Sequence, residues 1–216
     1  MPVIILADQY LLDSGFDVDM LPLSHVSVES AVVWTEPGYR RYALTASGIS
    51  PRGIPGWGDA LVAADSHEDD EDGHISEDLD LRIQMVDKRM RKLDSIVGNT
   101  PPPNYFGPSA ADILIVCWGS TFEIVREAVA ALGRNDLALM HFQQVFPLPK
   151  AIPEQFRKTA KLILLEGNPT GQFGALLTQQ WGLAWQHKIL KYNGLQFTVE
   201  EVCSALLKIL GKEEVL

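Results

Sequence analysis

The sequence contains few cysteines, and this scarcity excludes some kinds of site. Only Cys117 and Cys203 occur in the 216 residues, and both lie in apolar stretches. An iron–sulfur cluster of the usual kind is held by four thiolates, so any such cluster must be bound by another chain. We expect both cysteines to be buried free thiols.

Long hydrophobic runs and an excess of basic residues are also lacking. No apolar stretch approaches the roughly 20 residues needed to cross a bilayer, and the amino terminus lacks the basic-then-apolar order of a secretory signal. The chain has 28 acidic and 18 basic residues, which gives a formal net charge of -10. Such a charge repels nucleic acid and anionic lipid. We therefore expect a cytoplasmic protein that binds neither nucleic acid nor a membrane.

The first 98 residues show no regular alternation of strands and helices. Residues 2–7, PVIILA, have the pattern of a buried strand. We expect it to join a sheet built from other sequence or from a partner subunit; the alternative is an ordinary strand of the sheet that follows. Residues 8–59 predict a long irregular connection, and such connections are usually functional or bound to a partner. Residues 60–65, ALVAAD, predict another short strand.

The irregular region contains one candidate binding residue and one acidic loop. Arg52 lies between Pro51 and Gly53 on a constrained turn, where it pairs either with a ligand carboxylate or phosphate or with a structural salt-bridge partner. His67 and His74 flank five acidic residues, which makes a divalent cation site an alternative. The spacing does not match a calcium loop, so a solvated acidic loop is the favoured interpretation.

A long amphipathic helix is the clearest element of the first half. Ser76 is a suitable N-cap, and Glu77 and Asp78 follow where the helix dipole favours negative charge. Burying its apolar stripe is worth about 10 kcal/mol gross, so the stripe must face a core or a partner. The basic cluster beside the stripe either meets phosphates or forms a solvated face, and we favour the solvated face. The stripe comprises Leu79, Ile83, Val86, Met90, Leu93 and Val97, and the basic cluster comprises Lys88, Arg89, Arg91 and Lys92.

The second half of the chain predicts a separate α/β domain. Residues 99–108, NTPPPNYFGP, form a proline-rich linker. Beyond them, strand patterns in ADILIVCW, LALMHF, KLILLE and HKILKY alternate with helical stretches. This alternation predicts an α/β fold over residues 109–216, with three α/β/α layers and a mainly parallel sheet.

Ligand sites of such sheets lie in a crevice at the carboxyl ends of the strands. Two loops supply candidate residues there: Gly119, Ser120 and Thr121 in one, and Asn168, Thr170, Gly171 and Gln172 in the other. The first loop opens a helix whose free amides suit an anion, unless Ser120 is a plain N-cap.

Two further residues near the strand ends have alternative interpretations. Glu166 is either a buried acid or a residue that caps a helix or contacts a partner. His141 is either a base or, as we favour, a hydrogen-bonded core histidine. The sequence contains no P-loop, Rossmann glycine triplet, nucleophile elbow or zinc ligand pair. We therefore assign no catalytic, cofactor-binding or metal-binding residue.

Several motifs occur in the order found in a known family. The chain resembles the carboxyl-terminal part of 2-oxoacid:ferredoxin oxidoreductase alpha subunits. The resemblance implies that residues 109–216 are similar to the transketolase carboxyl-terminal domain. It also implies that residues 1–98 hold the end of a pyrimidine-binding domain, the irregular connection and the long helix. The motifs are PVIILADQYL, RRYALTASGISPRGIPG, HEDDEDGHISED, MVDKRMRKLD, WGST, HFQQVFPLP, EGNPTGQ and KYNGLQFTVEEV.

The resemblance implies an enzyme that uses thiamine diphosphate to decarboxylate a 2-oxoacid. It passes electrons through iron–sulfur centres to ferredoxin and transfers the acyl group to coenzyme A. In that family, the glutamate that activates the cofactor and the segments that hold the substrate carboxylate lie upstream of Pro2. The diphosphate and magnesium site and an iron–sulfur cluster belong to the beta subunit.

The resemblance therefore leads us to expect a chain that binds no cofactor alone and is inactive alone. We expect it to be a shortened chain, a split-gene product or a fragment of a longer reading frame. Its expected partners are a beta subunit and, where present, gamma and delta subunits, in an oligomer that meets ferredoxin and coenzyme A. The alternative is an independent, non-catalytic α/β protein that binds a phosphorylated small ligand in the strand-end crevice.

Overall fold

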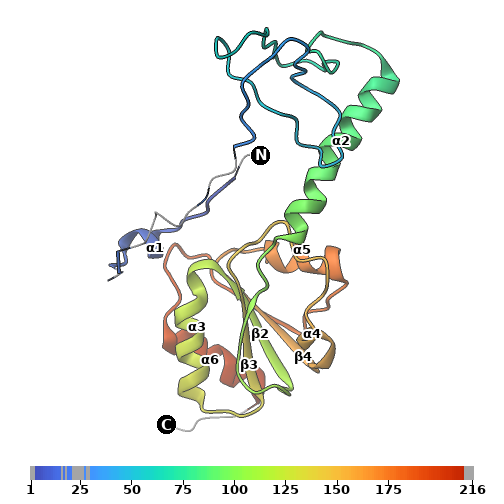
Figure 1. Cartoon of the computed structure of the whole chain (residues 1–216). Coiled ribbons are helices and arrows are strands. Elements are labelled where there is room, and N and C mark those ends of the chain that lie inside the picture. The colour runs from blue at the N-terminus through green and yellow to red at the C-terminus, as the bar shows by residue number, and fades with distance from the viewer. Residues whose placement is uncertain (1–2, 16, 18, 21–26, 28–29, 212–216) are drawn as a thin grey trace. The chain divides into compact units, whose positions relative to one another are not determined.

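The computed structural model describes residues 3–15, 17, 19–20, 27 and 30–211 (Figure 1). The chain divides into two compact units. One comprises residues 1–16 and 100–216, and the other comprises residues 17–99. Each described helix falls short of the length or the hydrophobicity that crossing a bilayer demands.

A five-stranded sheet forms the centre of the first unit, with the order β1-β3-β2-β4-β5. The last four strands along the chain are parallel, and β1 is antiparallel to β3. The predicted mainly parallel sheet is therefore confirmed. β1 lies inside the predicted linker and was missed, because three residues between prolines and a glycine give no periodic signal. The strands are β1 (Asn104–Phe106), β2 (Ile113–Trp118), β3 (Leu137–Phe142), β4 (Lys161–Glu166) and β5 (His187–Leu190).

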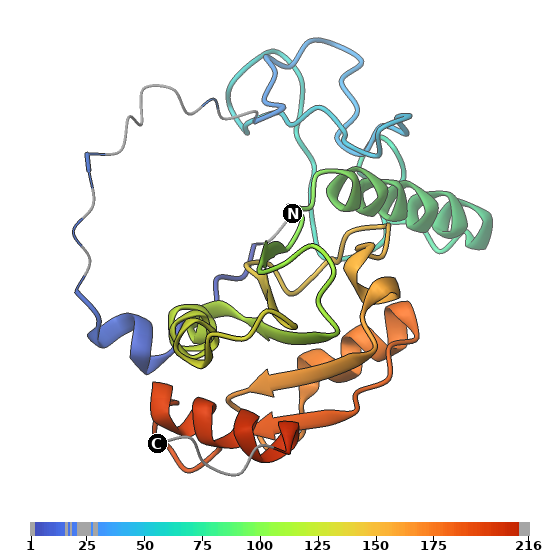
Figure 2. The ribbon, with the colours of Figure 1, turned by 90° about the horizontal axis from the view of Figure 1, so that it is seen from below.

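Helices cover both faces of this sheet, which confirms the predicted three layers (Figure 2). One face is covered by α3 (Phe122–Leu132) and α6 (Val199–Leu210). The other is covered by α4 (Gln155–Lys158) and α5 (Gln172–Trp181).

The side chains of β2 show why two helical layers are needed. Successive side chains of a strand point to opposite faces. Ile115 and Cys117 pack with α3 and α6, whereas Leu114 and Val116 pack with α4 and α5. These four side chains are fully buried, so the strand is apolar on both faces.

The first described residues do not form the strand predicted for residues 2–7. Val3, Ile4 and Ile5 are 83–86% exposed and pair with no strand, while Pro2 lies outside the described residues. The interpretation of this segment as part of the following sheet is therefore wrong, because its backbone groups pair with no strand of that sheet. Its pairing with another polypeptide stays a prediction. The short helix α1 (Gln9–Asp13) follows within the predicted irregular connection.

The second unit consists of loops around the long helix α2 (Leu79–Gly98). The predicted N-cap was two residues early: the Asp78 carboxylate, not Ser76, accepts from the amides of Asp80 and Leu81, at 2.8 and 2.9 Å. The strand predicted for residues 60–65 does not form. A short apolar run without a neighbouring strand has no partner for its backbone groups.

Basic residues of α2 bind the loops of this unit. The buried Lys88 ammonium donates to the carbonyl of Tyr42, and the Arg91 guanidinium donates to the carbonyl of Thr45 at 3.2 Å. Burial lowers the pKa of Lys88 to about 8, and the nearby Lys92 adds to this effect.

The carboxylate of Glu68, which lies in a loop, also binds basic residues of α2. Arg89 donates to both of its carboxylate oxygens, at 2.7 and 2.9 Å, and Arg82 donates to one of them at 3.0 Å. The hydrogen bond from Arg89 is the main reason that the pKa of Glu68 is lowered. The interpretation of the basic cluster as a solvated face is therefore wrong for Lys88, which is buried, whereas Arg89 is exposed and Arg91 and Lys92 are half-buried.

The lowered pKa of Lys88 predicts a pH-dependent stability. Between about pH 8 and the ordinary lysine pKa of about 10.4, the unfolded chain binds a proton that the folded chain does not. The free energy of unfolding of the unmodified chain, minus that of the Lys88→Met variant, should therefore rise between about pH 8 and pH 10. Chemical denaturation at several pH values measures this difference. Lys150→Met, at an exposed position of the first unit, is the control, and a flat difference for Lys88→Met contradicts the prediction.

Candidate functional site

The sheet has a topological switch point at β2. After β2 the chain passes to β3 on one side, and β4 later pairs with the other side of β2. The helix after β2 covers one face, and the helix after β4 covers the opposite face. A crevice outside the carboxyl ends of parallel strands opens at such a point, and this is the candidate site.

A cavity of about 370 Å³ lies at this end of the first unit. It is lined by residues that follow three strands: Ser120 and Thr121 after β2, Gly167 after β4, and Lys191 and Tyr192 after β5. The predicted crevice is therefore present, and Ser120 and Thr121 line it.

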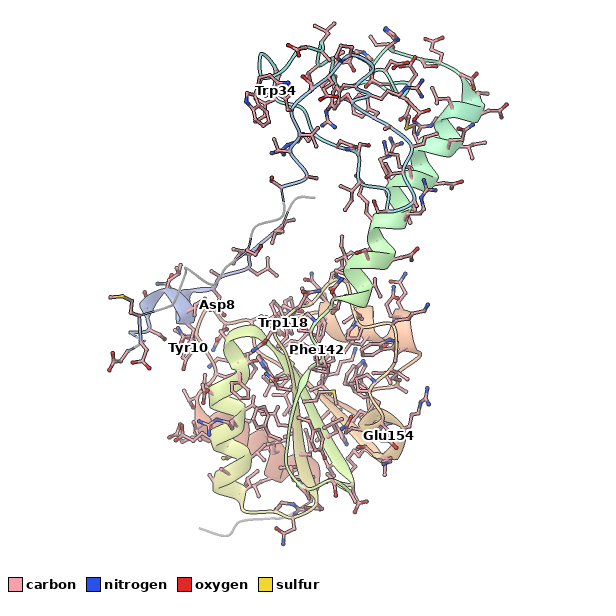
Figure 3. The ribbon with its side chains drawn as sticks, in the orientation of Figure 1. Asp8, Tyr10, Trp34, Trp118, Phe142 and Glu154 are labelled. Carbon is pink, nitrogen blue, oxygen red and sulfur yellow. The ribbon has the colours of Figure 1, made fainter. Side chains whose placement is uncertain are left out.

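Ser120 contacts a carboxylate of the amino-terminal segment. Its hydroxyl donates to Asp8, which also caps α1 and lines the cavity together with Tyr10 (Figure 3). Ser120 is not the predicted N-cap, because Thr121 holds that position in α3 and donates its hydroxyl to the Trp118 carbonyl at 2.8 Å. The Asp8 carboxylate thus accepts from a hydroxyl of the loop where we expected an external anion.

Lys191 brings a positive charge to the cavity, but this charge is already paired. Its ammonium lies 2.6 Å from a carboxylate oxygen of Glu201 and also donates to the Gln196 carbonyl. The hydrogen bond from Lys191, together with that from the backbone amide of Thr198, lowers the pKa of Glu201. Sequence reasoning missed Lys191, although its position directly after a parallel strand was a usable signal.

The second predicted loop is organised by the carboxylate of Glu166 at the end of β4. This residue is fully buried. It accepts hydrogen bonds from the backbone amides of Phe173 and Gly174, at 3.1 and 2.8 Å, and from the Asn168 side chain at 2.6 Å. Glu166 therefore caps the amino terminus of α5, as one of its two interpretations predicts.

Asn168 completes this cap. Its side-chain oxygen accepts from the backbone amides of Thr170, Gly171 and Gln172, at 3.2, 2.7 and 3.3 Å. Gly171 has a left-handed φ of 66°, which a glycine adopts without strain. The four candidate residues of this loop, Asn168, Thr170, Gly171 and Gln172, do not line the cavity. Their contact with a partner or ligand stays a prediction.

His141 is a core residue, as favoured. Its Nε2 lies 2.9 Å from the carbonyl oxygen of Gly119, and its ring centroid lies 4.6 Å from that of Phe122. Burial lowers the pKa of His141 and raises that of the fully buried Cys117 thiol to about 12. Both cysteines are free, although Cys203 is only half-buried.

Arg52 belongs to the other unit. Its backbone amide donates to Ala31 at 2.8 Å, and its carbonyl accepts from Val33 at 3.1 Å. Its side chain is exposed and forms no ion pair with any residue in the described ranges. The structural salt bridge that we considered is therefore not found among those residues.

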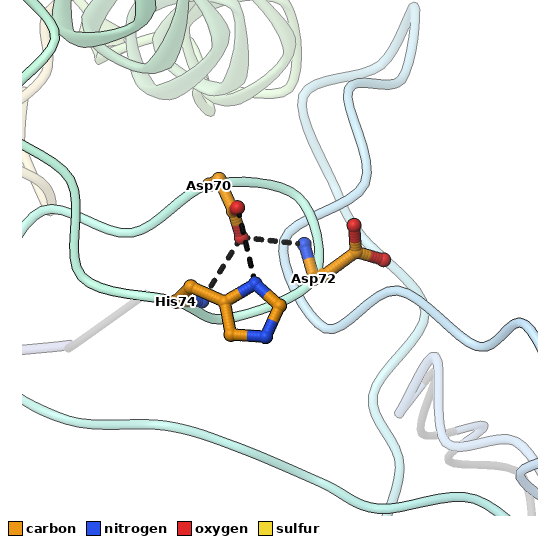
Figure 4. A group of neighbouring side chains, drawn as sticks. All are labelled: Asp70, Asp72 and His74. Carbon is orange, nitrogen blue, oxygen red and sulfur yellow. Dashed lines mark hydrogen bonds and ion pairs between the residues drawn. The ribbon is translucent and has the colours of Figure 1, made fainter.

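The acidic loop brings three potential ligands together. Ligand atoms of Asp70, Asp72 and His74 lie within 4.8 Å of one another (Figure 4). One oxygen of Asp70 accepts from the backbone amides of Asp72, Gly73 and His74, at 3.0, 2.9 and 2.9 Å. The bond from His74 is the main reason that the pKa of Asp70 is lowered. These bonds account for the turn without an ion. The interpretation of a solvated loop is wrong for Asp69, which is buried, and for Glu68, which is paired with Arg82 and Arg89.

No family model matches the chain, but several curated proteins do. The alpha subunit of 2-oxoacid:ferredoxin oxidoreductase 1 from Sulfurisphaera tokodaii is 31% identical over 222 residues, which are 99% of this chain and 35% of that protein. The alpha subunit of oxidoreductase 2 from Aeropyrum pernix is 32% identical over 100% of this chain and 35% of that protein. The chain is a homologue of 2-oxoacid:ferredoxin oxidoreductase alpha subunits. It spans about a third of the length of these curated relatives.

A solved structure agrees with this relationship. A 2-oxoglutarate:ferredoxin oxidoreductase from Magnetococcus marinus, with 2-oxoglutarate, coenzyme A and succinyl-CoA bound, has a TM-score of 0.71 and 28% identity. The match covers 81% of this alpha-subunit homologue and 32% of the solved chain. The predicted resemblance to this family and the predicted fold class are therefore confirmed.

The Glu166 cap predicts a large effect of a small substitution. Glu166→Gln keeps the shape but replaces one acceptor oxygen with an NH2 donor, which faces backbone N–H groups. The free energy of unfolding should fall by about 2 kcal/mol, because a buried donor loses its acceptor. Urea denaturation measures the change. The exposed Glu127→Gln on α3 is the matched control and should shift stability by less than about 0.5 kcal/mol; equal stabilities of the two variants would contradict the assigned cap.

Proposed function

We propose that the chain is the carboxyl-terminal part of the alpha subunit of a cytoplasmic 2-oxoacid:ferredoxin oxidoreductase. The complex would decarboxylate a 2-oxoacid with thiamine diphosphate, reduce ferredoxin and form acyl-CoA. The observation that carries the proposal is the similarity to alpha subunits along 99% of the chain. The related structure from M. marinus, which holds a 2-oxoacid and coenzyme A, also supports it.

Two charged groups near the crevice, Glu166 and Lys191, do not support a thiamine diphosphate site there. Activation of its aminopyrimidine, as the family resemblance implies, requires a glutamate that is free to exchange a proton. The fully buried Glu166 accepts three hydrogen bonds from its own loop and helix, so it does not fit this role. The cation in the cavity, Lys191, is likewise paired with Glu201. We therefore propose that thiamine diphosphate, magnesium and the iron–sulfur cluster are held by other polypeptide and that the chain alone is inactive.

The role left for the chain is to support assembly and to flank the active site. We propose that the exposed loop residues Thr170 and Gln172, together with Arg52, contact the beta subunit or another part of the complex. Asn168 and Gly171 would hold that loop in shape from inside. The alternative protein that binds a phosphorylated ligand is less well supported, because the carboxylate of Asp8 adds negative charge beside Ser120 and the Lys191 ammonium is paired with Glu201.

Reconstitution tests the proposed function. The chain is purified alone and also together with an affinity-tagged beta subunit and the remaining alpha-subunit sequence of a relative. Ferredoxin reduction is then followed with a 2-oxoacid, coenzyme A, thiamine diphosphate and magnesium. We expect association and activity only in the reconstituted mixture. Ferredoxin reduction by the chain alone would overturn the inactive-alone proposal, and failure to associate would overturn the assembly role.

A single surface variant tests the loop. Gln172→Arg places a charge at the start of α5 and should weaken association with the complex about tenfold, as expected for a residue in an interface. Gln179→Arg introduces the same charge on the exposed side of the same helix and serves as the control. Affinities are measured by biolayer interferometry on the tagged partner. The same affinity for both variants would remove this loop from the proposed interface.

A further inference from the structure

The apolar stripe of α2 has the spacing of a coiled-coil seam. Its six residues follow one another at intervals of four, three, four, three and four. This is the spacing of the a and d positions of a heptad, which form the contact line between two supercoiled helices. In this register, Leu79, Val86 and Leu93 are d positions, and Ile83, Met90 and Val97 are a positions.

The seam is exposed within the chain. Leu79, Ile83 and Met90 are 76%, 59% and 55% exposed, and Val86 is 37% exposed. The loops of the second unit instead cover a different face of α2. Met85 and Lys88, at the c and f positions, are the buried residues of this helix. The predicted stripe therefore has no core to face among the described residues, and only its end at Leu93 and Val97 is half-buried.

The two edges of the seam carry opposite charges. The e positions hold Asp80, Asp87 and Asp94, which are exposed and make no ion pair with any residue of the described ranges. The g positions hold Arg82 and Arg89, and their exposed guanidinium groups share the single carboxylate of Glu68. The edge formed by the e positions is thus acidic. At the edge formed by the g positions, two arginines share one carboxylate, which leaves one positive charge in excess.

We propose that a second copy of this chain covers the seam, with the two α2 helices parallel and in register. In a parallel pair, each g residue faces the e residue five positions later on the other helix. Arg82 then faces Asp87 of the second copy, and Arg89 faces Asp94. An antiparallel pair would instead bring aspartates against aspartates, which is unfavourable. The charge pattern of α2 is therefore complementary to itself in the parallel arrangement.

The packing of the second unit agrees with this arrangement. The loop contacts at Tyr42 and Thr45 lie on the side of Lys88 and Arg91, the f and b positions. A twofold axis along the seam places these loops on the outside of both helices. The seam spans fewer than three heptads, so the dimer should be weak and depend on concentration. This inference does not rest on the proposed enzymatic function.

Sedimentation equilibrium of the full chain over a wide concentration range tests the dimer. Asp87→Arg removes two symmetry-related pairs with Arg82 and creates repulsion, so the dissociation constant should rise about tenfold. Asp80→Arg is the matched control, because its counterpart in a parallel pair is residue 75, before the helix begins. It should leave the dissociation constant almost unchanged. Circular dichroism verifies that both variants remain folded.

Cysteine cross-linking tests the orientation. Leu79→Cys should form a disulfide between two copies under mild oxidation, because d positions face each other in a parallel pair. In an antiparallel pair of the same seam, the two introduced thiols at position 79 would be about 27 Å apart and could not be bridged. Gln84→Cys, at an exposed position outside the seam, is the control and should not cross-link.

The possible results separate clearly. A weak dimer that Asp87→Arg weakens and Asp80→Arg spares, together with cross-linking at position 79, supports the proposal. A chain that stays monomeric up to about 1 mM overturns it. So does a dimer that tolerates Asp87→Arg or cross-links equally at positions 79 and 84.

Discussion

Burial of the parallel sheet on both faces is the constraint from which the architecture of the first unit follows. The central strands β2, β3 and β4 are apolar on both sides, so each face needs a helical layer. The chain passes from β2 to one side and later from β4 to the other, so the right-handed crossovers place the helices after β2 and β4 on opposite faces. The same constraint brings the loops after β2, β4 and β5 to one end of the sheet, where the cavity lies.

The polar groups at that end mostly serve the fold. Glu166 and Asn168 satisfy the free amides at the start of α5, and Glu201 joins Lys191 to the cap of α6. The three hydrogen bonds that Glu166 accepts commit this buried carboxylate to its own loop and helix. The site thus has the shape of a ligand crevice, but its charged groups Asp8 and Lys191 are engaged with Ser120 and Glu201. This agrees with the proposed supporting role in a larger oxidoreductase.

The second unit has little regular structure, and α2 organises it through two different faces. One face binds the loops through Lys88 and Arg91, whose charged groups satisfy backbone carbonyls that no strand or helix can satisfy. The other face carries the exposed apolar seam. A helix that binds loops through polar groups can leave its most apolar stripe uncovered within the chain, so of the two predicted alternatives, a core or a partner, the described residues do not supply the core.

Local signals in the sequence determined the family, the α/β class and the helices and parallel strands of the second half of the chain. Apolar runs such as Leu162–Leu165 are long enough for a two-sided strand to be recognised, and the ordered motifs are specific together. The sequence did not determine which polar groups would meet across long separations. Ser120 with Asp8 and Lys88 with Tyr42 are examples. It also overestimated strands at residues 2–7 and 60–65. Only the tertiary structure decides such cases, because a strand or a hydrogen bond requires a partner in space, and a local pattern specifies only one of the two.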